Sequence, residues 1–386
     1  MLEPPSVTIN CVTDPGFDEI GQLLAEHGPA GFDLLAERFI ASGNFPAAFE
    51  ARLMKKRVEM GLPLMSQSQG DLSPENARTY ADAQIAAARE IGGLYLGRND
   101  IRRAWPYFRA IGETGVVKDA IEKLSLEMDG DLIDGAIEVG FYEAVHPEKG
   151  LALLLNRHGI CRAITTFGQY PSLEGRDAAG ALLIRTIYDE LRGSILSALE
   201  MEDSGASLLE LVEANEALFA GNASYIDVSH VISVLRYAIE LEDSQILQRS
   251  YELTEYGRRL SEMYQFKGQF PFEEPFPDYG AYLQALLGMN VDAALDRFRA
   301  KLSPEPDPYG DIAAQTLVNL LVRLDRLPEA IDVAEERLAG IPLDRLICPG
   351  PLELCERAGD FDRLRSIALQ TNNRIAYAAA LAKQPK

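Results

Sequence analysis

The sequence predicts an all-α fold, an α-α superhelix in which antiparallel helix pairs stack as a right-handed solenoid. Apolar residues recur at helical spacing along the chain after Phe17, whereas strand-like alternation is nearly absent. One type of turn recurs five times, and each copy opens into an amphipathic segment. The last two copies begin at Asp325 and Gly359, 34 residues apart, a common length for a repeated helix-turn-helix unit. The five copies are Gly43–Ala48, Asn99–Ala104, Met289–Ala294, Asp325–Ala330 and Gly359–Leu364.

The N-terminal part of the chain is expected to form two helix pairs. Phe39 precedes the first turn and Phe49 follows it, each within an apolar stripe of helical period. A polar loop at 66–70 then separates the pairs. Ser73 followed by Pro74 predicts a helix start, because Ser caps exposed N–H groups and Pro fits the first turn.

The second of these pairs resembles the tetratricopeptide repeat family. In that family one helix carries a small residue and then an aromatic one, and its partner helix opens with Ala and continues with an aromatic. Gly92 and Tyr95 match the first helix, and Ala104 and Phe108 match the second. Small residues let two helices approach closely while the rings fill the space beside the crossing. Residues in the same roles elsewhere are Leu35, Ala36, Phe39 and Ala48, and Leu317, Leu321, Ala330 and Ala334.

Two positions near the C-terminus depart from the family pattern. Val318 stands where a small residue is usual, and Leu364 stands where Ala is usual. These departures leave the register of the last two repeats open but keep the helical hairpins. The resemblance covers about half of the chain and implies a binding scaffold with a concave face.

The middle of the chain lacks a clear repeat turn but keeps a helical pattern. A Gly-terminated helix is expected at His158–Gly159, and three further helices at 182–199, 208–218 and 228–241. The segment Gln265–Tyr279 is irregular and rich in Phe and Pro, and long ordered loops are often functional. Alternatively, its phenylalanines fill a gap between neighbouring helices. The expected parts are 1–16 (an extension), 17–125 (repeats), 126–277 (the central segment) and 278–386 (repeats).

Composition narrows the classes of partner. The 386 residues are 47% hydrophobic and 25% charged, and 59 acidic against 37 basic residues give a formal charge of −22. Such a field repels phosphate backbones and anionic lipid, so we expect no nucleic-acid partner and no membrane partner. A basic peptide, a metal ion or a neutral small molecule is more compatible with the negative charge of the protein. The acid excess can also simply be a solvated surface.

Cysteine usage and the N-terminus favour a cytoplasmic protein. The four cysteines form no CxxC pair and fit reduced, buried thiols. No secretory signal and no run of about 20 apolar residues is visible. Cytoplasmic localisation is therefore the expectation.

Histidines in the central segment suggest a second kind of site. Glu143 and His146, and likewise Asp227 and His230, are three residues apart, so each pair shares one side of a helix. Together they could bind a divalent metal, in the manner of helical di-metal bundles. Alternatively, His146 marks a helix break, His158 lies at a helix C-terminus where the helix dipole favours a positive charge, and His230 is a buried core residue whose hydrogen bonds are satisfied. The candidate ligand-binding residues are His146, His158, Asp227, His230, Arg236 and Tyr237.

Two functions follow, and the sequence leaves the choice open. The first is a tetratricopeptide-like scaffold that binds a protein or peptide partner; the resemblance places Tyr282, Asn319 and Arg323 in its groove. The alternative is an enzyme or small-molecule sensor with a polar, metal-binding pocket among the central helices. No known catalytic motif is present, so no cofactor beyond that metal is expected, and whether the chain is an enzyme stays open.

Overall fold

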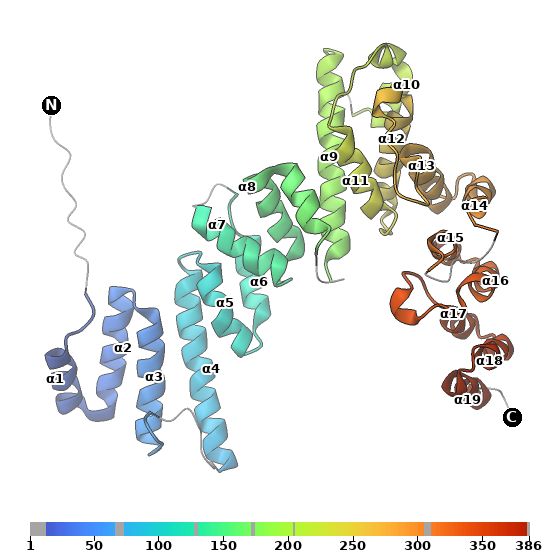
Figure 1. Cartoon of the computed structure of the whole chain (residues 1–386). Coiled ribbons are helices and arrows are strands. Elements are labelled where there is room, and N and C mark those ends of the chain that lie inside the picture. The colour runs from blue at the N-terminus through green and yellow to red at the C-terminus, as the bar shows by residue number, and fades with distance from the viewer. Residues whose placement is uncertain are drawn as a thin grey trace, which may run out of the picture. The chain divides into compact units, whose positions relative to one another are not determined.

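The fold was analysed in a computed structural model, which describes residues 13–65, 73–126, 130–170, 174–203, 205–304 and 310–383. These residues form helices joined by turns and loops, and no strand occurs among them (Figure 1). Helices that follow one another in the sequence pack against each other, so the predicted all-α class and α-α superhelix are confirmed. Most of the expected extension 1–16 and the polar loop 66–70 lie outside the described residues.

The chain divides into two compact units, Met1–Ala179 and Gly180–Lys386. The boundary falls within helix α9 (Arg176–Ala198), inside the central segment expected at 126–277. The first unit holds α1 (Phe17–His27), α2 (Gly31–Ser42), α3 (Phe45–Glu59), α4 (Pro74–Leu96), α5 (Ile101–Ala110), α6 (Thr114–Glu122), α7 (Gly130–Ile137), the π-helix η2 (Glu138–Tyr142) and α8 (Pro147–Phe167).

The second unit continues from α9 with shorter helices. Helices α10 and α11 both pack against α12, and from α12 to α19 each helix packs against the next one in the sequence. The helices are α10 (Leu208–Ala214), α11 (Val228–Ala238), α12 (Ser244–Arg259), α13 (Pro275–Leu286), α14 (Val291–Arg299), α15 (Ile312–Arg323), α16 (Leu327–Leu338), α17 (Pro351–Ala358), α18 (Phe361–Gln370) and α19 (Arg374–Lys383), with the 3₁₀ turn η5 (Leu343–Arg345) before α17.

The recurring turn has a defined backbone. A residue in the left-handed conformation ends one helix, and the next residue begins the following one. Gly43, Asn99 and Gly359 take the left-handed position, and Asn44, Asp100 and Asp360 then cap the next helix with their side chains. In these three turns the N–H of the capping residue also bonds the carbonyl five residues earlier, which satisfies both helix ends.

Helices α4 and α5 pack closely at the second turn. A Cβ on Gly92 would lie 2.7 Å from the Phe108 ring, so only glycine permits this approach of α4 and α5. Ala104 is fully buried beside it. The Tyr95 ring of α4 meets Phe45 of α3 edge-on at 4.9 Å, which links these two consecutive helices. The packing in this region is consistent with a helical repeat.

Helix α8 bends where the sequence predicts a stop. Gly159 has φ of +78° inside α8, so the helix kinks after His158 and then continues. Just before α8, the chain forms the π-helix η2, a geometry that often occurs at functional sites. None of the described helices combines the length and apolar character needed to cross a bilayer.

A cleft in the second unit as candidate functional site

The second unit contains a cavity of about 810 Å³, here called the cleft, between α11, α13, α15 and the loop 265–274. Its walls combine aromatic rings with charged and amide side chains. Lining residues include Arg236, Glu240, Lys267, Gln269, Phe270, Phe272, Tyr279, Tyr282, Thr316, Asn319, Arg323 and Ile347.

Aromatic stacking fixes the loop that forms one wall. The Phe272 ring stacks on Tyr279 of α13 with centroids 4.3 Å apart, and it meets Phe298 of α14 at 5.4 Å. Phe272 and Phe276 are buried, whereas Phe266 and Phe270 are about half exposed. Two of the four phenylalanines thus fill a gap between helices, and Phe270 lines the cleft; a functional role of the loop stays a prediction.

Polar contacts hold the same loop closed. Gly268 donates its N–H to the Glu273 carbonyl at 2.9 Å. A Cβ on Gly268 would lie 2.0 Å from the Phe272 carbonyl oxygen, so the loop can form only with glycine at this position. At its start, the Gln265 side-chain amide donates to the carbonyls of Gly257 and Leu260, which ties the loop to the end of α12.

A buried ion-pair network supports the helix behind the loop. Asp278 of α13 is fully buried and pairs with Arg297 at 2.6 Å and Lys301 at 3.0 Å. Its second oxygen also accepts the N–H of Glu274, at the start of α13. Lys301 in turn bonds Glu273 of the loop at 2.7 Å. Because every partner lies on the loop, α13 or the end of α14, the network fixes their relative positions.

The opposite wall binds a stretch of the chain's own backbone. The crossing segment, residues 342–348, passes over α15 on its way to α17. Gln315 accepts the N–H of Ile347 at 2.6 Å and donates to the Arg345 carbonyl at 3.4 Å. Asn319 donates to the Ile347 carbonyl at 3.0 Å. Two amide side chains one helical turn apart thus bind an extended backbone, and Ile347 faces the cleft with its side chain largely exposed.

Arg323 joins two walls of the cleft. Its guanidinium donates to the carbonyls of Ile239 and Leu241, just beyond the end of α11, where a cation is favourable. Burial raises the pKa of the neighbouring Tyr282 to about 12, although Arg323 acts in the opposite direction. Tyr282, Asn319 and Arg323 all line the cleft, as the resemblance predicts for a groove. Asn319 and Arg323, however, already bond main-chain groups of this chain.

The cleft is basic although the protein is acidic. Among the described residues, Arg236, Lys267 and Arg323 line it, against a single acid, Glu240. Arg236 and Lys267 form no ion pair with any residue in the described part of the chain, and Arg236 is exposed. The charge of the cleft is therefore positive, opposite in sign to the total of −22. It favours a ligand that carries a negative charge.

The three predicted site residues of the first unit have separate partners. Glu143 pairs with Arg109 at 3.1 Å, and His146 pairs with Glu122 at 2.8 Å. His158 lies 3.7 Å from Asp134 and lines a smaller cavity of about 540 Å³ beside α7 and η2. His146 and His158 stand at opposite ends of a helical stretch about 18 Å long, so they do not form one pocket.

In the second unit, Asp227 caps α11. It accepts hydrogen bonds from the N–H and hydroxyl of Ser229, at 2.9 and 2.7 Å, and the hydroxyl bond is the main cause of the lowered pKa of Asp227. His230 lies 3.9 Å from the same carboxylate. Tyr237 is half-buried on α11 and is not part of the cleft lining, whereas Arg236 is.

The proposed metal ligands belong to different units: Glu143 and His146 to the first, Asp227 and His230 to the second. Among the described residues, no group of three or more His, Cys, Asp and Glu side chains is arranged to hold a metal ion. The divalent-metal site stays a prediction from the sequence. Comparisons with known protein families, with curated proteins and with solved structures find no significant match to this chain.

Proposed function

We propose that this chain is a tetratricopeptide-like scaffold, and that its second unit binds an extended, acidic peptide segment of a protein partner in the cleft. The observation that carries this proposal is the lining of the cleft, where Arg236 and Lys267 lie beside aromatic rings and neither forms an ion pair with a described residue. Gln315 and Asn319 of α15 already bond the N–H and the carbonyl of Ile347 within this chain, so a bound peptide would contact the other groups of the lining.

The remaining walls supply specificity. The exposed ring of Phe270 and the ring of Tyr279 offer apolar contact to a side chain of the peptide. Arg236 and Lys267 offer two positive charges that form no ion pair with the described side chains. A peptide with a carboxylate next to an apolar or aromatic residue fits both features. The cavity of about 810 Å³ has room for a few residues of such a chain.

The proposal is tested by selecting linear peptides of about 12 residues from a display library against the full chain, and then measuring their affinity by isothermal titration calorimetry. We expect the selected peptides to be enriched in Asp or Glu beside an apolar residue. Reversing one charge, Arg236→Glu, should weaken them by about tenfold or more, because a favourable charge pair becomes a repulsive one.

Lys118→Glu is the matched control, because Lys118 is an exposed cation on α6 of the first unit. This variant should bind the selected peptides as the parent chain does. If selection yields no acidic peptides, or if Arg236→Glu binds them as tightly as the parent, the cleft is not the peptide site.

A further inference from the structure

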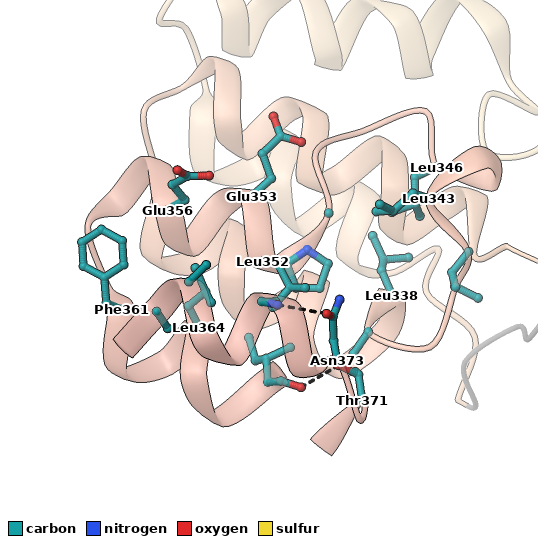
Figure 2. A pocket seen from close by; sticks show the side chains of 18 of the residues that line it. Leu338, Leu343, Leu346, Leu352, Glu353, Glu356, Phe361, Leu364, Thr371 and Asn373 are labelled. Atoms are coloured by element: carbon teal, nitrogen blue, oxygen red, sulfur yellow. Dashed lines mark hydrogen bonds between the residues drawn. The ribbon is translucent and has the colours of Figure 1, made fainter. Parts of the chain in front are cut away.

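A second cavity lies at the C-terminal end of the second unit, between the end of α16, η5 and helices α17, α18 and α19 (Figure 2). It measures about 640 Å³ and is here called the C-terminal pocket. Leucine, isoleucine, alanine and proline make up most of its lining. In Figure 2, Leu338, Leu343 and Leu346 lie on one side of it, and Leu352 and Leu364 on the other.

The few polar side chains within the pocket are already bonded. Thr371 donates to the Ile367 carbonyl at 2.8 Å, and Asn373 accepts the Ala376 N–H at 3.0 Å, as the dashed lines in Figure 2 mark. The lining therefore offers apolar contact. Leu343 is 79% exposed at the edge of the pocket, so its apolar side chain faces water. A bound apolar group would displace that water.

The rim of the pocket is acidic. Glu353 and Glu356 lie one turn apart on α17, and among the described lining residues Lys383 of α19 is the only cation. Glu353 pairs with Arg357 at 2.5 Å, whereas Glu356 forms no ion pair within the described ranges. A positively charged group on the occupant would complement Glu356, and a fatty-acid carboxylate would be repelled there.

The floor on the α19 side is made of small residues. Ala376, Ala379 and Ala382 line the pocket, and such residues let the backbone of another helix approach closely. We infer that the C-terminal pocket binds the apolar face of an amphipathic helix from a protein partner, with a Lys or Arg of that helix beside Glu356. This site differs from the acidic-peptide cleft in lining, in charge and in the form of its ligand.

The probe is a synthetic helical peptide of about 18 residues with Leu at helical spacing on one face, flanking Lys residues and a fluorescein label. One Leu is replaced by photo-leucine, which cross-links to its neighbours under light. A second peptide has Glu in place of the flanking Lys. Affinity for the full chain is measured by fluorescence anisotropy, and cross-linked residues are located by mass spectrometry.

We expect the Lys-flanked peptide to bind at least about tenfold more tightly than the Glu-flanked one and to cross-link within residues 338–383. Leu343→Asp and Glu356→Lys should each weaken it by about tenfold. Both side chains are exposed, so these variants should keep the parent circular dichroism. Two controls should bind normally: Leu369→Asp, an exposed leucine of α18 outside the lining, and Arg236→Glu in the cleft.

Three results would overturn the inference. The first is no binding of the Lys-flanked peptide, and the second is equal binding of the two peptides. The third is cross-links outside the pocket. Stoichiometric binding of decanoate that Leu343→Asp abolishes, without peptide binding, would assign the pocket to a lipid chain instead. Because Arg236→Glu is a control here and the test variant for the cleft, either proposal can fail without the other.

Discussion

The side-chain amide of Asn319 donates a hydrogen bond to the main-chain carbonyl of Ile347, with 3.0 Å between nitrogen and oxygen. Together with Gln315, it holds the crossing segment against α15, so that Ile347 faces the cleft while Leu343 and Leu346 line the C-terminal pocket. One short segment thus forms part of the cleft and of the C-terminal pocket. Its position depends on two amide side chains whose removal has measurable effects.

Gln315→Ala should loosen the crossing segment. The Ile347 N–H loses its acceptor, and we expect a loss of about 1 kcal/mol in the free energy of unfolding. Amide hydrogen exchange at Ile347, measured by NMR, should accelerate. Asn319→Ala is the control, because it removes only the bond to the carbonyl and leaves the N–H bonded. Unchanged exchange at Ile347 in the Gln315 variant would show that other contacts hold the segment.

Asp278→Ala should be among the most destabilising substitutions in the second unit. It leaves Arg297 and Lys301 without their fully buried partner, and breaking a buried ion pair in this way costs about 3–5 kcal/mol. Urea denaturation measures the effect. Asp292→Ala breaks a pair with Arg326 at 3.0 Å, but Asp292 is largely exposed, so it should cost about 1 kcal/mol or less. Similar losses for the two variants would contradict the assigned role of Asp278.

Gly257→Ala should destabilise α12 against α13. The new Cβ would lie 2.1 Å from the Phe276 ring, which is fully buried, and overpacking of this kind costs about 1–3 kcal/mol. Gly193→Ala is the matched control within α9, since no atom lies within 4 Å of the position that its new methyl group would take and Ala favours a helix. Thermal unfolding should show a lower Tm for the first and an equal or higher Tm for the second.

Alkaline pH should destabilise the second unit through Tyr282. Burial raises its pKa from an ordinary value near 10 to about 12, so the folded state favours the neutral phenol. The stabilisation is complete below pH 10 and is lost as pH rises toward about 12, because the unfolded chain releases the proton first. Tyr282→Phe should flatten this part of the stability profile. If the parent and this variant lose stability in parallel, Tyr282 does not titrate as its burial implies.

Local signals in the sequence predict the turns well. Gly43–Asn44, Asn99–Asp100 and Gly359–Asp360 adopt the expected helix-ending and helix-starting conformations, because backbone freedom and capping are properties of adjacent residues. The same turn also occurs at Gly112 and Asn372, where the sequence pattern is weaker. At the two departures from the family pattern, Val318 and Leu364 are buried, so the larger side chains are accommodated.

Prediction of the site is only partial, and the reason is physical. Tyr282, Asn319 and Arg323, which the family resemblance places in a groove, line the cleft together with the loop that the sequence marks as irregular. The spacing of Glu143 and His146 could not show that each bonds a different helix, because those partners, Arg109 and Glu122, lie at least 24 residues away in sequence. The net charge likewise could not show that one cleft is basic.

The central claim, that the cleft binds an acidic peptide, is tested most directly by hydrogen–deuterium exchange of the full chain with and without a selected peptide. We expect protection of the loop 265–274, of α11 near Arg236 and of the crossing segment, with no change in the first unit. In the Arg236→Glu variant, the same peptide should leave the hydrogen–deuterium exchange of these three segments unchanged. Protection confined to α1–α8, or protection that Arg236→Glu leaves intact, would contradict the claim.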